Sequence, residues 1–170
     1  DNDSGDYWSA SSQPVGKDIT VYKSECRHGT GYTRMNADYS GIHSEALYYV
    51  PLDKEYEVWR LRLTNNSGVV RNLNITGYGE FTNNSNYEQD QVNLQYSQFI
   101  TRTVFCGNRI CPLIHGNLDG LEEGKDVDDK IVVERFFGLA GAEVSSYCGD
   151  RERFLGRYHG YGNPDGVIRG

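Results

Sequence analysis

Apolar and polar residues alternate in short segments between residues 18 and 81, with turn-forming residues between the segments. An alternation of period two is typical of a β-strand that buries one face. The clearest example is 57–64, where Trp59, Leu61 and Leu63 alternate with arginine, so we expect these three side chains to face inward. The pattern predicts strands at 18–23, 32–39, 42–50, 57–64 and 73–81.

Turn-forming residues occur at 40–41, 53–54 and 65–68, which spaces the expected strands about ten residues apart. Such spacing is typical of an antiparallel sandwich or barrel. Gly77 and Gly79 fall on the inward face of their segment. A glycine inside a strand indicates a bulge or a close backbone approach, so we expect one of these features here.

The second half of the chain has a less regular pattern. We expect a strand at 92–105, its hairpin partner at 109–115, a return to the sheet at 131–142 and a short helix within 150–158. Residues 1–15 lack periodicity and are expected to be a loop, or else a strand end docked by Trp8, and 82–91 is expected to be a polar loop. The acidic segment 117–129 is expected to be a solvated loop or insertion. The fold class is therefore all-β: one large antiparallel β-sandwich domain over 1–170, which starts and stops in mid-pattern and is expected to be incomplete at both ends.

Composition adds that the core is thin. Only 37% of the 170 residues are apolar, while 13 are tyrosine and 20 are glycine. The net charge of -7 argues against nucleic acid and anionic membranes as partners, because both require a basic surface. The chain also has no apolar run of bilayer-spanning length. It begins without Met in a polar run, and we expect it to be part of a longer protein.

The four cysteines are expected to be reduced thiols in a cytoplasmic protein. Cys106 and Cys111 flank a plausible turn at 107–108, which would pair Cys106 with Arg109 and Cys111 with Val104. The two sulfurs would then lie diagonally, with Cβ atoms about 7 Å apart, too far for a disulfide. A zinc site made of these two thiols, His115 and either Cys148 or His159 lacks the usual ligand spacing, so we expect no metal.

One unusual segment is the run Glu-Cys-Arg-His-Gly-Thr-Gly-Tyr at 25–32. It offers the donors of Arg27 and His28 beside two glycines, which can take conformations closed to other residues. The segment could be a rigid corner that presents these groups to a sugar. The alternative is a tight turn into a strand, in which both side chains satisfy loop carbonyls, and local chemistry favours this turn.

Amide side chains next to tyrosine occur at Asn93, Gln95 and Tyr96. Amides can meet sugar hydroxyls and a ring can stack on a pyranose, but an amide-rich sheet edge explains the pattern as well. Paired carboxylates for glycoside hydrolysis could come from four residues. These are Glu45, Glu57, Glu80 and Asp90. Nothing around them in the sequence raises a pKa, so ordinary surface roles are expected.

Several motifs follow one another in a recognisable order. They are residues 7–9, 14–15, 25–33, 41–42, 50–51, 57–60, 64–65 and 153–156. In this order they resemble the N-terminal sandwich domain of glycoside hydrolase family 94, the inverting β-glucan phosphorylases. Residues 88–96 and 135–142 look most like the cellodextrin phosphorylase branch, with cellobiose phosphorylase second. The resemblance covers nearly the whole chain.

The resemblance implies a supersandwich of two large antiparallel sheets. In the family it precedes a helical (α/α)6 barrel that carries the general acid, in cytoplasmic enzymes that are typically homodimers. Inorganic phosphate is the co-substrate and cleaves β-glucosidic bonds to give α-glucose 1-phosphate, without a resident cofactor. No residue of this chain matches the catalytic motifs of the barrel. Gln95 fits a position implied to reach the acceptor sugar, whereas Tyr96 stands where related enzymes have arginine.

Three hypotheses follow. The first is a non-catalytic N-terminal region of a cytoplasmic cellodextrin or cellobiose phosphorylase, inactive alone, that shapes the acceptor side and the dimer contact. Its sugar-contacting residues would be Asn93, Gln95, Tyr96, Arg27 and His28, and its ligand a β-glucan oligosaccharide. The second is a free-standing carbohydrate-binding module. The third is a structural interface domain without sugar contact.

Overall fold

The structure is a computed structural model that describes residues 1–81, 91–92, 101–113 and 135–169. It divides into two compact units, one formed by 1–76 with 155–170 and the other by 77–154. The expected acidic loop at 117–129 lies outside the described residues, as does most of the expected loop at 82–91. The assignment of 1–170 to a single domain stays a prediction. No described helix is both long enough and apolar enough to cross a membrane.

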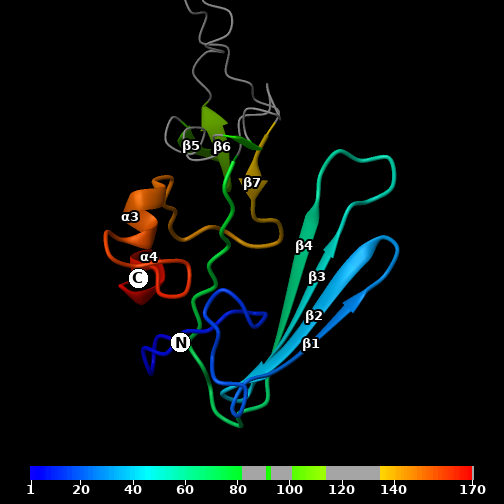
Figure 1. The fold of residues 1–170 in the computed structure, drawn as a ribbon, viewed down its shortest axis with the longest axis vertical. Helices are drawn as coiled ribbons and strands as arrows, with labels where there is room; N and C mark the ends of the chain where they lie inside the picture. Colours follow the sequence, from blue (N-terminus) through cyan, green and yellow to red (C-terminus); the bar gives the residue numbers. More distant parts are fainter. Residues whose placement is uncertain (82–90, 93–100, 114–134, 170) are drawn as a thin grey trace, which may run out of the picture. The chain divides into compact units, whose positions relative to one another are not determined.

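The first unit contains a four-stranded antiparallel sheet in the order β1-β2-β3-β4 (Figure 1). The strands are β1 (Lys23–His28), β2 (Tyr32–Tyr39), β3 (Ile42–Tyr49) and β4 (Val58–Asn65). The all-β prediction is confirmed, and β2, β3 and β4 begin and end within one residue of the expected bounds. These three strands are the segments with the clearest alternation.

Two of the strands expected between residues 18 and 81 are wrong. Of the strand expected at 92–105, the described residues contain only 102–105, and 91–92 are helical. Residues 18–21 form a turn, because the Asp18 carboxylate accepts a hydrogen bond from the Thr20 amide at 2.8 Å and the Asp18 carbonyl accepts one from the Tyr22 amide at 2.9 Å. An aspartate that bonds two residues ahead favours a turn over a strand. The segment 73–81 has no strand either. Just before it, the Asn72 backbone bonds to the N-terminal segment through the Asn2 amide at 2.8 Å.

The turn between β2 and β3 confirms its prediction. Ser40 and Gly41 have φ angles of 51° and 75°, as a two-residue hairpin turn requires. Gly41 also lies against the next turn, because an added Cβ would be only 2.8 Å from the Ser67 Cβ. Asp53, with φ of 58°, makes the expected turn before β4.

The core lies on one face of this sheet, against the N-terminal segment. Ile42, Ser44 and Ala46 alternate along β3 and are all buried. Ser44 donates a hydrogen bond to the Ala10 carbonyl at 3.0 Å, and the Trp8 and Tyr39 rings lie 5.4 Å apart. Residues 1–15 therefore form a loop, which is one of the two alternatives expected, and the Trp8 ring packs this loop on Tyr39.

The other end of the same face is more open. Trp59 and Leu61 lie on the predicted inward side, because they pair with Tyr48 and Ala46 of β3. They are nevertheless 47% and 37% exposed. The alternation was read correctly, but the N-terminal segment covers only the end of the face near Ile42.

Asp6 anchors the N-terminal segment electrostatically. Its carboxylate accepts hydrogen bonds from the Lys17 ammonium at 2.6 Å and from the Tyr39 hydroxyl at 2.8 Å. Burial raises the pKa of Asp6, but these two hydrogen bonds outweigh it and the net pKa lies below the ordinary value. The same contact with Asp6 raises the pKa of Lys17. Both groups are therefore charged at neutral pH in the folded chain.

The second unit contains the strands β5 (Arg102–Cys106), β6 (Arg109–Leu113) and β7 (Phe137–Gly138), in that order. The β5–β6 pairing places Cys106 opposite Arg109 and Val104 opposite Cys111, as predicted from the turn. Gly107 and Asn108 form this turn, with φ angles of 50° and 68°. The return to the sheet within 131–142 is limited, in the described part, to the two residues of β7.

Side chains of the second unit pack around this hairpin. The Phe105 and Tyr147 rings stack at 4.4 Å. An added Cβ on Gly77 would lie 3.0 Å from the Phe137 ring, whereas one on Gly79 would meet nothing within 4 Å. The close approach expected at these glycines therefore exists at Gly77 alone. The expected short helix is also present, as α3 (Arg151–Leu155), and a further helix is α4 (Asp165–Ile168).

Candidate functional site

The segment at 25–32 forms the end of β1, a turn and the start of β2. The Gly29 amide donates to the Tyr32 carbonyl at 2.9 Å and closes the turn. An added Cβ at Gly29 would collide with the Tyr32 ring, whereas one at Gly31 would meet nothing within 4 Å. The Tyr32 ring therefore lies directly against Gly29, and the interpretation as a tight turn into a strand is confirmed.

Arg27 and His28 point to opposite faces of the sheet. They are successive residues of β1, opposite Arg34 and Thr33 of β2, and side chains alternate along a strand. The structure therefore does not bring these two candidate sugar ligands together. The expectation that they bond to loop carbonyls is also wrong, because their partners are side chains.

Those partners make two separate clusters. Arg27 Nε donates to the Glu25 carboxylate at 2.8 Å on one face. On the other face, His28 Nδ1 lies 3.0 Å from the Thr33 hydroxyl oxygen and Nε2 lies 3.4 Å from the Cys26 sulfur. Both clusters are exposed. Asn93, Gln95 and Tyr96 lie outside the described residues, so their role at a sugar stays a prediction.

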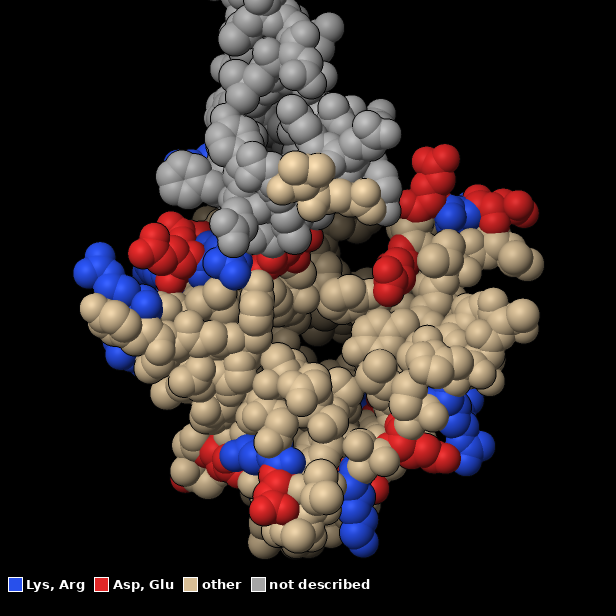
Figure 2. All heavy atoms as spheres, in the orientation of Figure 1, with Lys and Arg blue, Asp and Glu red and all other residues tan. Residues whose placement is uncertain are grey.

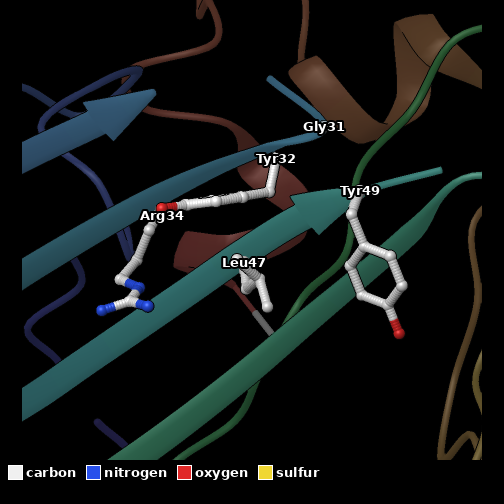
Figure 3. A pocket seen from close by; sticks show the side chains of 5 residues that line it. All are labelled: Gly31, Tyr32, Arg34, Leu47 and Tyr49. Carbon is white, nitrogen blue, oxygen red and sulfur yellow. The ribbon is translucent and has the colours of Figure 1, made fainter. Parts of the chain in front are cut away.

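A depression opens on the Arg27 face, beside the glycine turn (Figure 3). Its volume is about 350 Å³, and it is lined by Gly31, Tyr32, Arg34, Leu47 and Tyr49. Tyr32 pairs with Tyr49 and Arg34 with Leu47, so all four side chains share one face. Figure 3 shows Leu47 between the Arg34 side chain on β2 and the Tyr49 ring on β3. The depression thus combines an apolar floor with two phenols and a guanidinium.

The sequence analysis missed this grouping. The signal for it was available, because the two-residue turn at Ser40 and Gly41 fixes the β2–β3 register and so places Tyr32 opposite Tyr49. Alternation then puts Arg34 and Leu47 on the same face. What the sequence could not reveal is that this face stays open, since the N-terminal segment lies against the other one.

Three arginines lie in and next to the depression. Arg27, Arg34, Leu47 and Arg60 form one row across the four strands. Arg27 pairs with Glu25 at 2.7 Å, and Arg60 with Glu45 at 3.3 Å. Among the residues that the structure describes, Arg34 has no carboxylate within ion-pair distance. Its guanidinium can therefore serve hydroxyl or anionic groups of a ligand.

The candidate carboxylates have structural partners. Those that are described accept hydrogen bonds from nearby donors: Arg60 for Glu45, Trp59 for Glu57 and Arg151 for Glu80. These contacts agree with the ordinary surface roles expected from the sequence. Asp90 and the candidate metal ligand His115 lie outside the described residues. Within the described part, no three His, Cys, Asp or Glu side chains are grouped to hold a metal ion.

The four cysteines are free thiols, with Cys26 and Cys106 exposed and Cys111 buried. Burial raises the pKa of the Cys111 thiol, and the neighbouring Cys106 raises it further. Figure 2 shows that uncharged side chains make up most of the described surface in view, with basic and acidic residues in small separate clusters. That face has no extended basic surface of the kind that binds nucleic acid.

The described residues form two antiparallel sheets, and one of these sheets carries an open depression with polar and aromatic side chains. The whole chain, residues 1–170, matches the family described as "Glycosyl hydrolase 94, supersandwich domain". The chain belongs to this family, and the resemblance read from its motifs is confirmed.

Individual relatives agree with the family assignment. The chain is 34% identical over 171 residues to an N,N'-diacetylchitobiose phosphorylase of Vibrio proteolyticus. It is 30% identical over 170 residues to the enzyme of that name from Vibrio furnissii, and 29% identical over 181 residues to a solabiose phosphorylase of Paenibacillus borealis. Each alignment covers 100% of the chain and 20% of the relative. The chain thus spans about a fifth of the length of these phosphorylases.

Proposed function

We propose that this chain is the N-terminal sandwich region of an inverting phosphorylase that cleaves a β-linked saccharide with inorganic phosphate and releases an α-sugar 1-phosphate. The observation that carries the proposal is the match of all 170 residues to the supersandwich domain of this family. The names of the three relatives described above, each a phosphorylase, supply the reaction class.

In this proposal the chain has a non-catalytic role and is inactive alone. Phosphate acts as the nucleophile, so the protein needs to supply only one acid, which the downstream helical domain would carry. The engagement of Glu45 and Glu80 with arginine partners supports this division, because both carboxylates are already held by neighbouring side chains of the chain. The relatives are about five times as long as the chain, which leaves room for such a domain.

The preferred substrate is proposed to be a cellodextrin or cellobiose, from the likeness of 88–96 and 135–142 to that branch. A second candidate is N,N'-diacetylchitobiose, because two relatives at 34% and 30% identity carry that name. If Tyr96 contributes a ring to a longer acceptor, the exchange Tyr96→Ala in the complete enzyme should shift the chain-length preference toward the disaccharide. An unchanged preference would remove Tyr96 from the site.

The setting is proposed to be a cytoplasmic homodimer without a resident cofactor, in which the sandwich shapes the acceptor side and the contact between subunits. Support for the compartment comes from the four free thiols, which persist in a reducing environment. A free-standing carbohydrate-binding module remains the alternative function, because the open depression offers aromatic rings and polar groups of the kind that hold a sugar.

The test is release of sugar 1-phosphate from cellobiose, cellotetraose and N,N'-diacetylchitobiose in the presence of phosphate. This chain is assayed alone and beside a longer polypeptide that adds the downstream region. Activity in the longer polypeptide only is the expected result, and the ratio of rates among the three sugars identifies the branch. Activity in the short chain would mean that it carries the catalytic acid. Sugar binding by either protein without phosphorolysis would favour the binding module.

A further inference from the structure

The depression beside the glycine turn is an open hollow on one face of the sheet. Its volume of about 350 Å³ lies at the low end of the roughly 300–1,000 Å³ of small-molecule sites, and unlike most of them it is widely open to solvent. Its side chains stand on the neighbouring strands β2 and β3, which fix their spacing through backbone pairing. Tyr32 remains 45% exposed, so a ligand can reach its ring from solvent.

The chemistry of the lining is selective. The Tyr32 and Tyr49 side chains present aromatic surface together with hydroxyls. Leu47 of β3 supplies an apolar floor (Figure 3). A pyranose ring in a β-linked saccharide has apolar C–H faces and a rim of hydroxyls, so it matches aromatic surface and polar groups together.

Arg34 is the charged side chain of the depression. Its neighbours in the row, Arg27 and Arg60, are held by Glu25 and Glu45 respectively. In the described part of the chain no carboxylate pairs with Arg34. A planar guanidinium can donate two parallel hydrogen bonds to adjacent hydroxyls of one sugar.

We propose that Tyr32, Arg34, Leu47 and Tyr49 form a binding site for one or two sugar units of a β-linked saccharide on the open face of the sheet. The inference rests on the proposed function, which makes such a saccharide the ligand. The rings stack on the sugar faces, Leu47 closes the floor and Arg34 holds hydroxyls. An α-linked chain has a helical course and presents its faces differently, so it binds more weakly.

The test locates the ligand on the protein. The longer polypeptide that includes the downstream region is treated with an arginine-specific dicarbonyl reagent in phosphate-free buffer, where no phosphorolysis can occur. Modification of Arg34 is followed by mass spectrometry with and without cellotetraose, and maltotetraose is the α-linked control. We expect cellotetraose to slow modification of Arg34 at least about fivefold and to leave Arg62, an exposed arginine of β4 on the same face, unchanged. Equal rates at Arg34 with and without cellotetraose would overturn the site.

Variants provide a second readout. Tyr49→Ala should weaken cellotetraose binding about tenfold by calorimetry, whereas Tyr49→Phe, which keeps the ring, should retain most of the affinity. The matched control is Tyr56→Ala, which removes an exposed tyrosine from outside the depression. Equal affinity in Tyr49→Ala and the wild type would overturn the proposal. A change in molar mass by light scattering in Tyr49→Ala, without loss of sugar binding, would show that the face is an interface between copies and would also overturn it.

The same samples are assayed for phosphorolysis, which separates the two proposals. Phosphorolysis without protection of Arg34 would refute the sugar site and leave the proposed function standing. Protection of Arg34 without phosphorolysis of any of the three sugars would refute the proposed function and support the sugar site.

Discussion

The contact between Asp6 and Tyr39 makes a quantitative prediction about what holds the N-terminal segment on the sheet. Tyr39→Phe removes the hydroxyl that donates to the Asp6 carboxylate at 2.8 Å, while the ring stays to pack on Trp8 at 5.4 Å. A hydrogen bond to a charged group contributes about 1.5–3 kcal/mol when it is well buried. The Asp6 side chain is 33% exposed, so solvent weakens the interaction. We therefore expect Tyr39→Phe to lower the free energy of unfolding by about 1 kcal/mol, somewhat less than the range for a buried contact.

The assay is a double-mutant cycle with Asp6→Asn. The free energy of unfolding is measured by urea denaturation and tryptophan fluorescence, because Trp8 reports directly on this contact. Asp6→Asn also removes the ion pair with Lys17, so its loss should exceed that of Tyr39→Phe. We expect a coupling energy of at least about 0.5 kcal/mol between the two exchanges, since they remove the same hydrogen bond. Strict additivity would refute the assignment of this hydrogen bond as a stabilising contact.

The effect of Asp6 should depend on pH in a defined direction. Burial raises the pKa of Asp6, but the hydrogen bonds from Lys17 and Tyr39 lower it more, so the folded pKa lies below the unfolded one. The stabilisation is therefore present above about pH 4 and lost as the pH falls further. The pKa of Lys17 is raised by its contact with Asp6. The stabilisation that Lys17 contributes to the fold is therefore lost as the pH rises beyond about 10.5. A difference between wild type and Asp6→Asn that grows below pH 4 would contradict this account.

Three further predictions concern turns, thiols and a buried phenol. Gly41→Ala should cost more than about 1 kcal/mol in the free energy of unfolding, because Gly41 combines a φ of 75° with a contact to the next turn. Gly68→Ala should cost less, because Gly68 has a φ of 76° but lies in open space. The reverse order would refute the steric argument. A thiol reagent should modify exposed Cys106 at least about tenfold faster than buried Cys111, whose pKa is raised by burial, and equal rates in the folded chain would contradict that burial. Burial raises the pKa of Tyr22 to about 12. Its contribution to the free energy of unfolding is therefore fully present below about pH 10 and is lost as the pH rises toward 12. Tyr22→Phe, which deletes the hydrogen bond to the Ser9 carbonyl, should cost about 1 kcal/mol at neutral pH and weaken the alkaline loss of stability.

Local sequence information was sufficient for the hairpins. The strands 32–39 and 42–50 follow from alternation, and the turn at Ser40 and Gly41 sets their register because only two residues connect them. The pairing of Cys106 with Arg109 was predictable for the same reason. The motifs along the chain were likewise sufficient to identify the family.

Tertiary structure decided the features that depend on distant residues. The turn at Asp18 and the irregular course of 73–81 depend on side-chain and N-terminal hydrogen bonds that a periodic pattern does not contain. Arg27 and His28 look like one polar cluster in the sequence, yet strand geometry sends them to opposite faces. The sequence analysis therefore chose two residues that cannot share a ligand on one face.

The depression at Tyr32, Arg34 and Tyr49 illustrates the difference between what the sequence pattern predicts and what tertiary contacts decide. A period of two assigns each residue of a strand to one of two faces, and this assignment is local. Which face is then covered depends on where the N-terminal segment docks, and that is decided by contacts such as Ser44 with Ala10, 34 residues apart in the chain. The sequence by itself determined three strands of the first unit, the hairpin turns and the family, whereas only the folded chain decided which face of the sheet the N-terminal segment covers.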